Sequence, residues 1–168
     1  TTQPLRSVRL EATSRASLLA AADISQRFGE GNAFGLRINA AHERLRPQVR
    51  NLDGERSLLA AAADWRVSRD SVLEAEFEAS HKSQGSQVGW SLLGNRMPAP
   101  VDPRLNLNNQ AWAQPSVFDA FTGTVRFSQA LGSTWSWMAQ AGRQQLRTDD
   151  RTAFPFGCSA ENNYDRYC

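Results

Sequence analysis

Few residues of this chain combine types and spacing that could support chemistry, and the clearest set is a row of carboxylates. Glu74, Glu76 and Glu78 alternate with apolar residues, so on a strand they would share one face. Two carboxylates can act as general acid and base when an apolar pocket raises the pKa of one of them. Nothing near these three residues supplies such a pocket. A solvated strand face is therefore the better interpretation.

The other residues with catalytic potential are scattered. His42 and His81 are the only histidines, and isolated histidines are more often surface residues than ligands or bases. The sequence has no Gly-x-Ser-x-Gly motif, and Gly29-x-Gly31 with Gly35 lacks the spacing of a dinucleotide-binding loop. We therefore expect no enzymatic activity and no resident cofactor.

Cys158 and Cys168 are the only cysteines, and nine residues separate them. An even cysteine count suits a disulfide formed in an oxidising compartment, where it would make a loop rigid. A zinc site is the alternative. Two thiolates without a nearby histidine are an incomplete zinc shell, which favours the disulfide.

Composition excludes several classes of protein. The 168 residues include 19 Lys plus Arg and 17 Asp plus Glu, and a net charge of +2 does not favour binding to nucleic acid. No stretch approaches the roughly 18 consecutive apolar residues of a transmembrane helix, and the amino terminus lacks the pattern of a signal peptide. Strands that cross a membrane need only about ten residues of alternating polarity, so this composition permits them.

Alternation of polar and apolar residues is the recurring feature of the chain, and it predicts an all-β fold of seven antiparallel strands. The predicted strands are Leu5 to Ala12, Ala16 to Ile24, Phe34 to His42, Leu59 to Val67, Val72 to Ala79, Phe121 to Phe127 and Trp135 to Ala141. A helix is the alternative for Leu58 to His81, which is rich in Ala, Leu and Glu. The strict alternation and the polar break at 68–71 fit a helix poorly.

The predicted connections are short and long in turn. Residues 27–33, 68–71 and 129–133 form compact turns, whereas 45–57, 80–116 and the residues after 147 are long and polar. Short periplasmic turns and long extracellular loops alternate in this way in transmembrane β-barrels. The sequence therefore predicts part of such a barrel.

Four segments carry a resemblance to a known family. They are Phe34 to Glu43, Ser57 to Ser71, Gly89-Trp90-Ser91-Leu92, and Phe154-Pro155-Phe156-Gly157-Cys158 running to Cys168. In this order they resemble the TonB-dependent siderophore receptors, most closely the hydroxamate or ferrichrome type. The resemblance covers essentially the whole chain. Val88 stands where family members often carry a tyrosine, and this departure bears on which siderophore is bound.

The resemblance implies a barrel of about 22 strands in the bacterial outer membrane, of which residues 1–168 would be a partial domain without the plug. It implies a receptor that binds a ferric siderophore as cargo and imports it with energy from the TonB complex, acting through the plug. It also implies that outer-membrane lipid surrounds the barrel. Trp90, Phe154 and Phe156 would bind the chelate, and a disulfide between Cys158 and Cys168 would close a small extracellular loop.

A second hypothesis remains open. The chain could be a soluble extracytoplasmic β-rich binding or adhesion module stapled by its disulfide. That hypothesis predicts short loops and a sheet buried on both faces.

Overall fold

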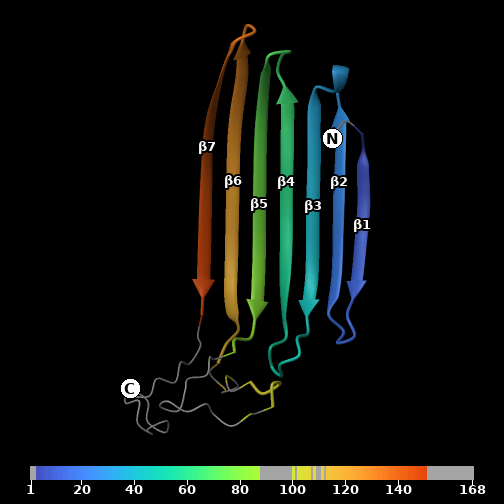
Figure 1. The fold of residues 1–168 in the computed structure, drawn as a ribbon, viewed down its shortest axis with the longest axis vertical. Coiled ribbons are helices and arrows are strands. Elements are labelled where there is room, and N and C mark those ends of the chain that lie inside the picture. Colours follow the sequence, from blue (N-terminus) through green and yellow to red (C-terminus); the bar gives the residue numbers. More distant parts are fainter. Residues whose placement is uncertain are drawn as a thin grey trace, which may run out of the picture.

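The computed structural model describes residues 3–87, 100, 102–106, 108, 111 and 113–150. Its elements are β1 (Leu5–Ala12), β2 (Leu18–Phe28), η1 (Glu30–Asn32), β3 (Phe34–Leu45), β4 (Gly54–Arg66), β5 (Ser71–Gln84), β6 (Ser116–Leu131) and β7 (Trp135–Asp149). The seven strands lie side by side in chain order and form one antiparallel sheet (Figure 1). This confirms the predicted all-β class, and the helical alternative for Leu58 to His81 is wrong.

The sheet has a turn end and a loop end. At the turn end, residues 29–33, 67–70 and 132–134 join β2 to β3, β4 to β5 and β6 to β7. Gly29 and Gly31 in the first of these turns and Gly132 in the third have positive φ angles of 81°, 61° and 71°, which permit tight reversals there. At the loop end, residues 46–53 and 85–115 make the longer connections, although residues 13–17 join β1 to β2 there by a short turn.

Most strands continue beyond the ends that alternation predicted. β4 begins five residues earlier, at Gly54, and β5 continues five residues further, to Gln84. β6 begins at Ser116 rather than Phe121, and β7 continues to Asp149 rather than Ala141. All four extensions lie at the loop end. The loops there are accordingly shorter than we expected.

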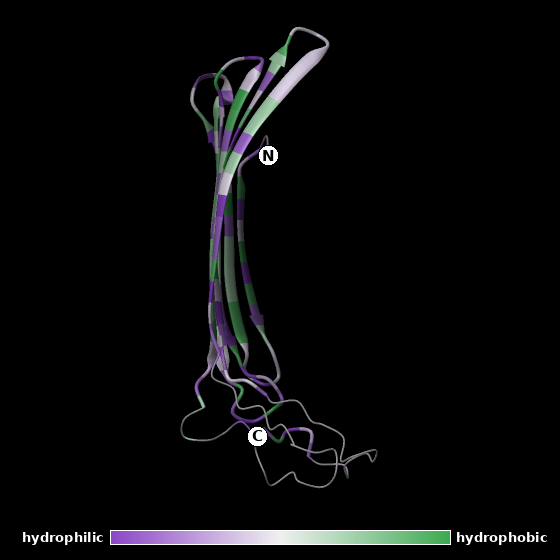
Figure 2. Ribbon diagram, turned by 90° about the vertical axis from the view of Figure 1, so that its left-hand side faces the viewer, coloured by the Kyte–Doolittle hydropathy of each residue, from purple (hydrophilic) through white to green (hydrophobic). Residues whose placement is uncertain are grey.

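The two faces of the sheet differ in polarity. One face, called the outer face below, carries most of the large apolar side chains, among them Ile24, Ile38, Leu59 and Val125. The inner face carries the carboxylates and arginines that alternate with them in the sequence. Figure 2 shows the sheet from its edge as a single curved layer, in which hydrophobic and hydrophilic segments alternate along the strands.

No element of the described chain packs against either face, because the contacts between elements run between neighbours in the sequence. The only hydrophobic residue buried in the described part is Leu52, in the loop between β3 and β4. The sheet therefore has no hydrophobic core of its own here. Among the described residues the only helix, η1, is three residues long, and no helix has the length and apolar character to cross a membrane.

Candidate functional site

Arginine–carboxylate pairs occupy the inner face near the turn end. Arg27 binds Asp64 through two parallel contacts, with Nη1 3.0 Å from Oδ1 and Nη2 2.5 Å from Oδ2. The Nε of Arg27 also donates to the carbonyl oxygen of Asn32 at 3.0 Å. Gly35 lies between the two partners on β3, and a Cβ atom there would lie 2.1 Å from Asp64 Oδ1. The absence of a side chain at Gly35 therefore lets this pair cross β3.

Two further pairs lie on the same half of the inner face. Arg37 binds Asp23 with Nε 3.0 Å from Oδ1 and Nη2 2.7 Å from Oδ2. Arg126 Nε lies 2.8 Å from Glu74 Oε2. Arg27 and Arg37 each bind a carboxylate through two contacts, the geometry that Arg and carboxylate prefer, whereas Arg126 makes one contact. The three pairs join β2 to β4, β2 to β3 and β5 to β6.

The carboxylate row on β5 lies on the inner face, as the sequence predicted. Glu74 pairs with Arg126, while Glu76 and Glu78 face a groove of about 270 Å³ lined by small side chains on the neighbouring strands. Within the described part of the chain, no group of three or more His, Cys, Asp or Glu residues is arranged to hold a metal ion. The row has the form of a solvated strand face, and the absence of catalysis stays a prediction.

The loop half of the inner face has a different character. A hollow of about 380 Å³ lies across β2 to β6, and we call it the loop-side hollow. Its apolar lining includes Leu19, Ala41, Leu58, Phe118 and Ala120, and its polar side chains include Glu43, Arg56 and Lys82. The register brings these residues into two adjoining rows of the sheet. The hollow thus combines an apolar floor with a few polar groups, as small-molecule sites do.

Only some of the polar side chains in the loop-side hollow form ion pairs. Arg56 Nε lies 2.6 Å from Glu43 Oε2, and the guanidinium remains largely exposed. Lys82, the only lysine of the chain, forms no ion pair with another residue of the described ranges. Its ammonium group therefore keeps its hydrogen-bond donors available to a bound molecule.

A second hollow of about 300 Å³ continues from the first toward the loops. Lys82 and Phe118 line both hollows, and Gln87 and Asp150 line the second. Nearby loop segments are held together by polar contacts: Gln84 Nε2 donates to the carbonyl of Leu52 at 3.1 Å, and Arg50 pairs with Asp102 at 3.0 Å. The hollow on the inner face and the hollow beside the loops are thus continuous through Lys82 and Phe118.

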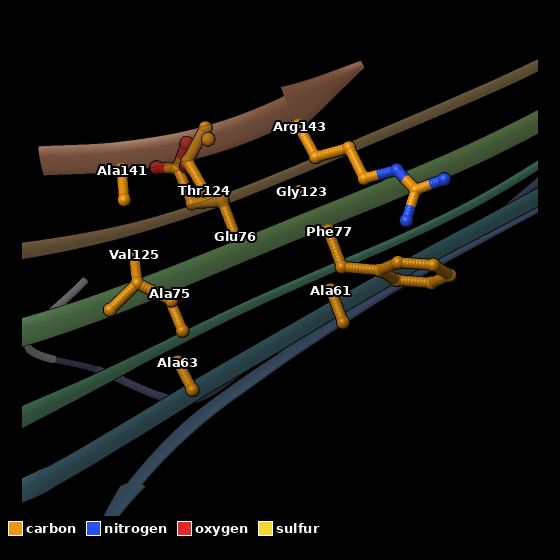
Figure 3. A pocket seen from close by; sticks show the side chains of 11 residues that line it. Ala61, Ala63, Ala75, Glu76, Phe77, Gly123, Thr124, Val125, Ala141 and Arg143 are labelled. Atoms are coloured by element: carbon orange, nitrogen blue, oxygen red, sulfur yellow. The ribbon is translucent and has the colours of Figure 1, made fainter. Parts of the chain in front are cut away.

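The outer face has a hollow of about 500 Å³ of a different kind (Figure 3). It is lined mainly by small side chains such as Ala61, Ala75 and Ala141, with Gly123 between Phe77 and Arg143 in the register. Arg143 is the one charged outer-face side chain in this lining. A largely apolar surface without converging polar groups does not fix the orientation of a ligand. The loop-side hollow is therefore the better candidate site.

The residues predicted to bind the ligand or to form the disulfide lie outside the described residues. Trp90 belongs to the segment 88–99, and Phe154, Phe156, Cys158 and Cys168 belong to 151–168. Their predicted roles stay predictions. The described chain reaches these segments at Gln87 and Asp150, and both of these residues line the second hollow.

The residues of the loop-side hollow are not among those that the sequence predicted. Arg56, Leu58, Lys82 and Phe118 all lie just beyond the predicted strand ends, on the extensions that the structure adds at the loop end. Counting the two-residue period past the predicted ends would have placed Leu58, Lys82 and Phe118 on the inner face. The presence of a single lysine at such a position was a signal that could have been used.

Comparison with known proteins identifies a similar fold. No family model matches the sequence, and no curated protein matches it. Among solved structures, the chain is similar to BauA, the ferric preacinetobactin receptor from Acinetobacter baumannii, with a TM-score of 0.77 and 18% sequence identity. The match covers 91% of this chain and 23% of that receptor. The chain therefore has the fold of a segment of a siderophore receptor and spans about a quarter of its length.

Proposed function

We propose that this chain is part of the wall of an outer-membrane receptor that binds a ferric siderophore and imports it. The observation that carries the proposal is the loop-side hollow on the inner face of a sheet whose outer face is exposed and apolar. A wall of this kind separates a lipid environment from a wet interior. The ligand would enter from the loop end, where the hollow opens.

The exposed apolar face favours a membrane over water. Val8 and Leu10 are each 76% exposed, and Ile24, Leu59 and Val125 are each about half exposed. Soluble proteins rarely display so continuous an apolar surface, because hydration of apolar area is costly. The alternative, a soluble binding or adhesion module, requires burial of both faces, and the described sheet has neither face covered. This favours the outer membrane as the location.

The loop-side hollow suits a chelate of moderate size. Its volume of about 380 Å³ falls within the range of small-molecule sites. Phe118, 39% exposed, offers an aromatic surface to the organic part of a chelate, and Lys82 can donate hydrogen bonds to the oxygen atoms that surround the iron. Iron would arrive as part of the cargo and leave with it.

The aromatic residues of the loops would complete the site. The segments that hold Trp90, Phe154 and Phe156 follow Gln87 and Asp150, which line the second hollow. These three aromatic residues would therefore contribute to binding beside that hollow. A disulfide between Cys158 and Cys168 would hold the segment that follows the two phenylalanines. The sequence resemblance favours a hydroxamate of the ferrichrome type as the ligand.

Import would require the rest of the receptor. The resemblance implies about 22 strands and a plug, and the TonB complex would pull on that plug from the periplasm to open the path. The present chain would supply a section of the wall and part of the binding surface. Energy coupling through TonB is carried by the resemblance alone.

Titration of the full-length receptor in detergent tests the proposal. The panel comprises ferric hydroxamates, ferric catecholates and haem, with tryptophan quenching as the readout. We expect tight binding of one hydroxamate, and Trp90→Ala should weaken it by about tenfold, or about 1.4 kcal/mol. Failure of every ferric chelate to bind the folded receptor would overturn the function. Binding that Trp90→Ala leaves unchanged would overturn only the role of Trp90.

A further inference from the structure

Buried polar side chains gather at the loop end of the sheet, beside the second hollow. Ser116, the first residue of β6, is only 7% exposed, and Asn106 and Asn108 in the loop before it are buried as well. A buried polar group costs free energy unless it forms a hydrogen bond. The partners of these side chains therefore show what their burial achieves.

A chain of hydrogen bonds passes through Ser116, and we call it the serine bridge. Oγ of Ser116 donates to Oδ1 of Asp150 at 2.7 Å and also forms a hydrogen bond with Oγ of Ser86. A serine hydroxyl has one proton, and Ser116 gives its proton to Asp150, so Ser86 is the donor to Ser116. The serine bridge therefore runs from Ser86 through Ser116 to a carboxylate, whose charge strengthens both hydrogen bonds.

The serine bridge joins the ends of two strands that do not pair with each other, because β6 lies between β5 and β7 (Figure 1). Ser86 lies two residues beyond the end of β5, and Asp150 directly follows β7, so neither belongs to the ladder of the sheet. Ser116 does belong to it and pairs with Gln84 on β5. Ser116 is therefore the fixed point from which the chain beyond both strands is held.

Asn108 holds Ser86 through a second contact. Nδ2 of Asn108 donates to the carbonyl oxygen of Ser86 at 3.2 Å, and the backbone N–H of Asn108 donates to Oδ1 of Asn106 at 2.9 Å. Buried partners thus bind both the hydroxyl and the carbonyl oxygen of Ser86. Outside the ladder of a sheet, such side-chain contacts take over the positioning of the backbone.

The serine bridge forms part of the wall of the second hollow. All three of its residues line that hollow, together with Lys82 and Phe118, which also line the loop-side hollow. A wall that is ordered before a ligand arrives lowers the entropic cost of binding. The serine bridge therefore connects the hydrogen bonds of the strand ends to the shape of the candidate site.

We infer that Ser116 is a positioning residue of the ligand site, which acts through the serine bridge to hold the wall of the second hollow in the shape that the ligand requires. The role in binding rests on the proposed function. Ser116 makes no contact with the ligand itself, because its hydroxyl is bound to Ser86 and Asp150. Loss of this hydroxyl should therefore loosen the wall and weaken binding without removing a group that touches the chelate.

Amide hydrogen exchange of the full-length receptor without ligand tests the effect on the wall. Ser116→Ala should speed exchange of the backbone amides at 85–87 by about tenfold, while amides in the middle of β5 keep their rates because the ladder remains. Ser83→Ala removes a hydroxyl from the outer face of β5 and is the matched control, with no change expected at 85–87. Unchanged exchange at 85–87 in Ser116→Ala would overturn the inference, whether or not any chelate binds.

Titration tests the effect on binding, and the probe is the ferric hydroxamate, ferric catecholate or haem that binds the unaltered receptor. Ser116→Ala should raise Kd about fivefold, whereas Ser116→Thr keeps a hydroxyl and should bind within about twofold of the unaltered receptor. Tm should fall by no more than about 2 °C, because the strand ladders do not depend on this hydroxyl.

A second variant shows whether the serine bridge acts as a unit. Ser86→Ala breaks the same chain of hydrogen bonds, so this variant, Ser116→Ala and the double variant should raise Kd by similar factors. Additive effects would overturn the positioning role, as would an unchanged Kd in Ser116→Ala; Ser86→Ala alone decides if Ser116→Ala does not assemble. Faster exchange at 85–87 in a receptor that binds no ferric chelate would instead support the serine bridge and contradict only the proposed function.

Discussion

The two halves of the inner face use the same backbone for different purposes. In the turn half, Arg27, Arg37 and Arg126 each bind a carboxylate on another strand. In the loop half, an apolar hollow lies beside Lys82, for which no ion pair is found in the described part of the chain. Charged side chains that form ion pairs with one another hold strands in register, whereas charged side chains without an ion pair can bind a ligand. Under the proposed function, the first half stabilises the sheet and the second half binds the ligand.

The largest effect on stability is expected at Gly35, where the Arg27–Asp64 pair crosses β3. Gly35→Ala would place a methyl group between Arg27 and Asp64, with its Cβ atom 2.1 Å from Asp64 Oδ1 and 2.7 Å from Arg27 Nη1. We expect a loss of about 2 kcal/mol in the free energy of unfolding, measured with urea in lipid vesicles, because the paired ends of the two side chains must move apart.

Gly123→Ala is the matched control for that variant. A Cβ atom at Gly123 would lie 3.5 Å from the ring of Phe121, an ordinary contact, so the stability should change by less than about 0.5 kcal/mol. Similar losses at both glycines would contradict the interpretation of the Arg27–Asp64 crossing.

In the loop half the expected effect is on binding. Phe118→Ala should weaken binding of the ferric siderophore by about tenfold, or about 1.4 kcal/mol, because it removes aromatic surface from both hollows. Val117→Ala alters the neighbouring residue on the outer face and should leave the affinity unchanged. Equal effects of the two substitutions in isothermal titration would place the ligand elsewhere.

Lys82→Gln should have a smaller effect in the same assay. The amide keeps much of the length of the side chain and some hydrogen-bonding capacity but lacks the charge, so a roughly threefold rise in Kd is expected. Arg44→Gln removes a cation at a similar level of the outer face and serves as the control. If Lys82→Gln and Arg44→Gln bind the siderophore equally well, the charge of Lys82 does not contribute to the affinity.

The smallest effects are expected for one arginine substitution in each half, compared by Tm and by Kd. Arg126→Gln removes a partly exposed ion pair and should lower Tm by no more than about 2 °C without changing Kd. Arg56→Gln removes a similar partly exposed pair with Glu43 and should lower Tm by a similarly small amount, but it should also raise Kd, since its guanidinium borders the loop-side hollow. The opposite result, with Arg126→Gln raising Kd and Arg56→Gln leaving it unchanged, would show that the division into structural and recognition halves is wrong.

The sequence predicted the fold well where the environment of the two faces differs. β1 has the predicted bounds, and β3 and β7 begin at the predicted residues Phe34 and Trp135. In the middle of each strand one face is apolar and the other polar, so alternation is strong. Backbone hydrogen bonding and side-chain polarity then point to the same assignment.

Prediction failed where the strands continue into polar surroundings. On β5, residues 80–84 are polar on both faces, and on β7 the residues beyond Gly142 are almost all polar. The hydrogen-bond ladder continues through these segments, because it depends on the backbone, but the contrast between faces is lost. The candidate site lies largely on these extensions, with Arg56, Lys82 and Phe118 among its residues. This is why the sequence located the wall but not the residues of the hollow.

The simple order of the strands has a consequence for how such a wall can change over time. In the described sheet each strand pairs only with its neighbours in the sequence, so a hairpin such as β6–β7 brings its turn and its own pairing with it. Duplication or loss of a hairpin would change the circumference of the wall while leaving the remaining strand pairs intact. Families with different numbers of strands can therefore arise from one architecture by the gain or loss of whole hairpins.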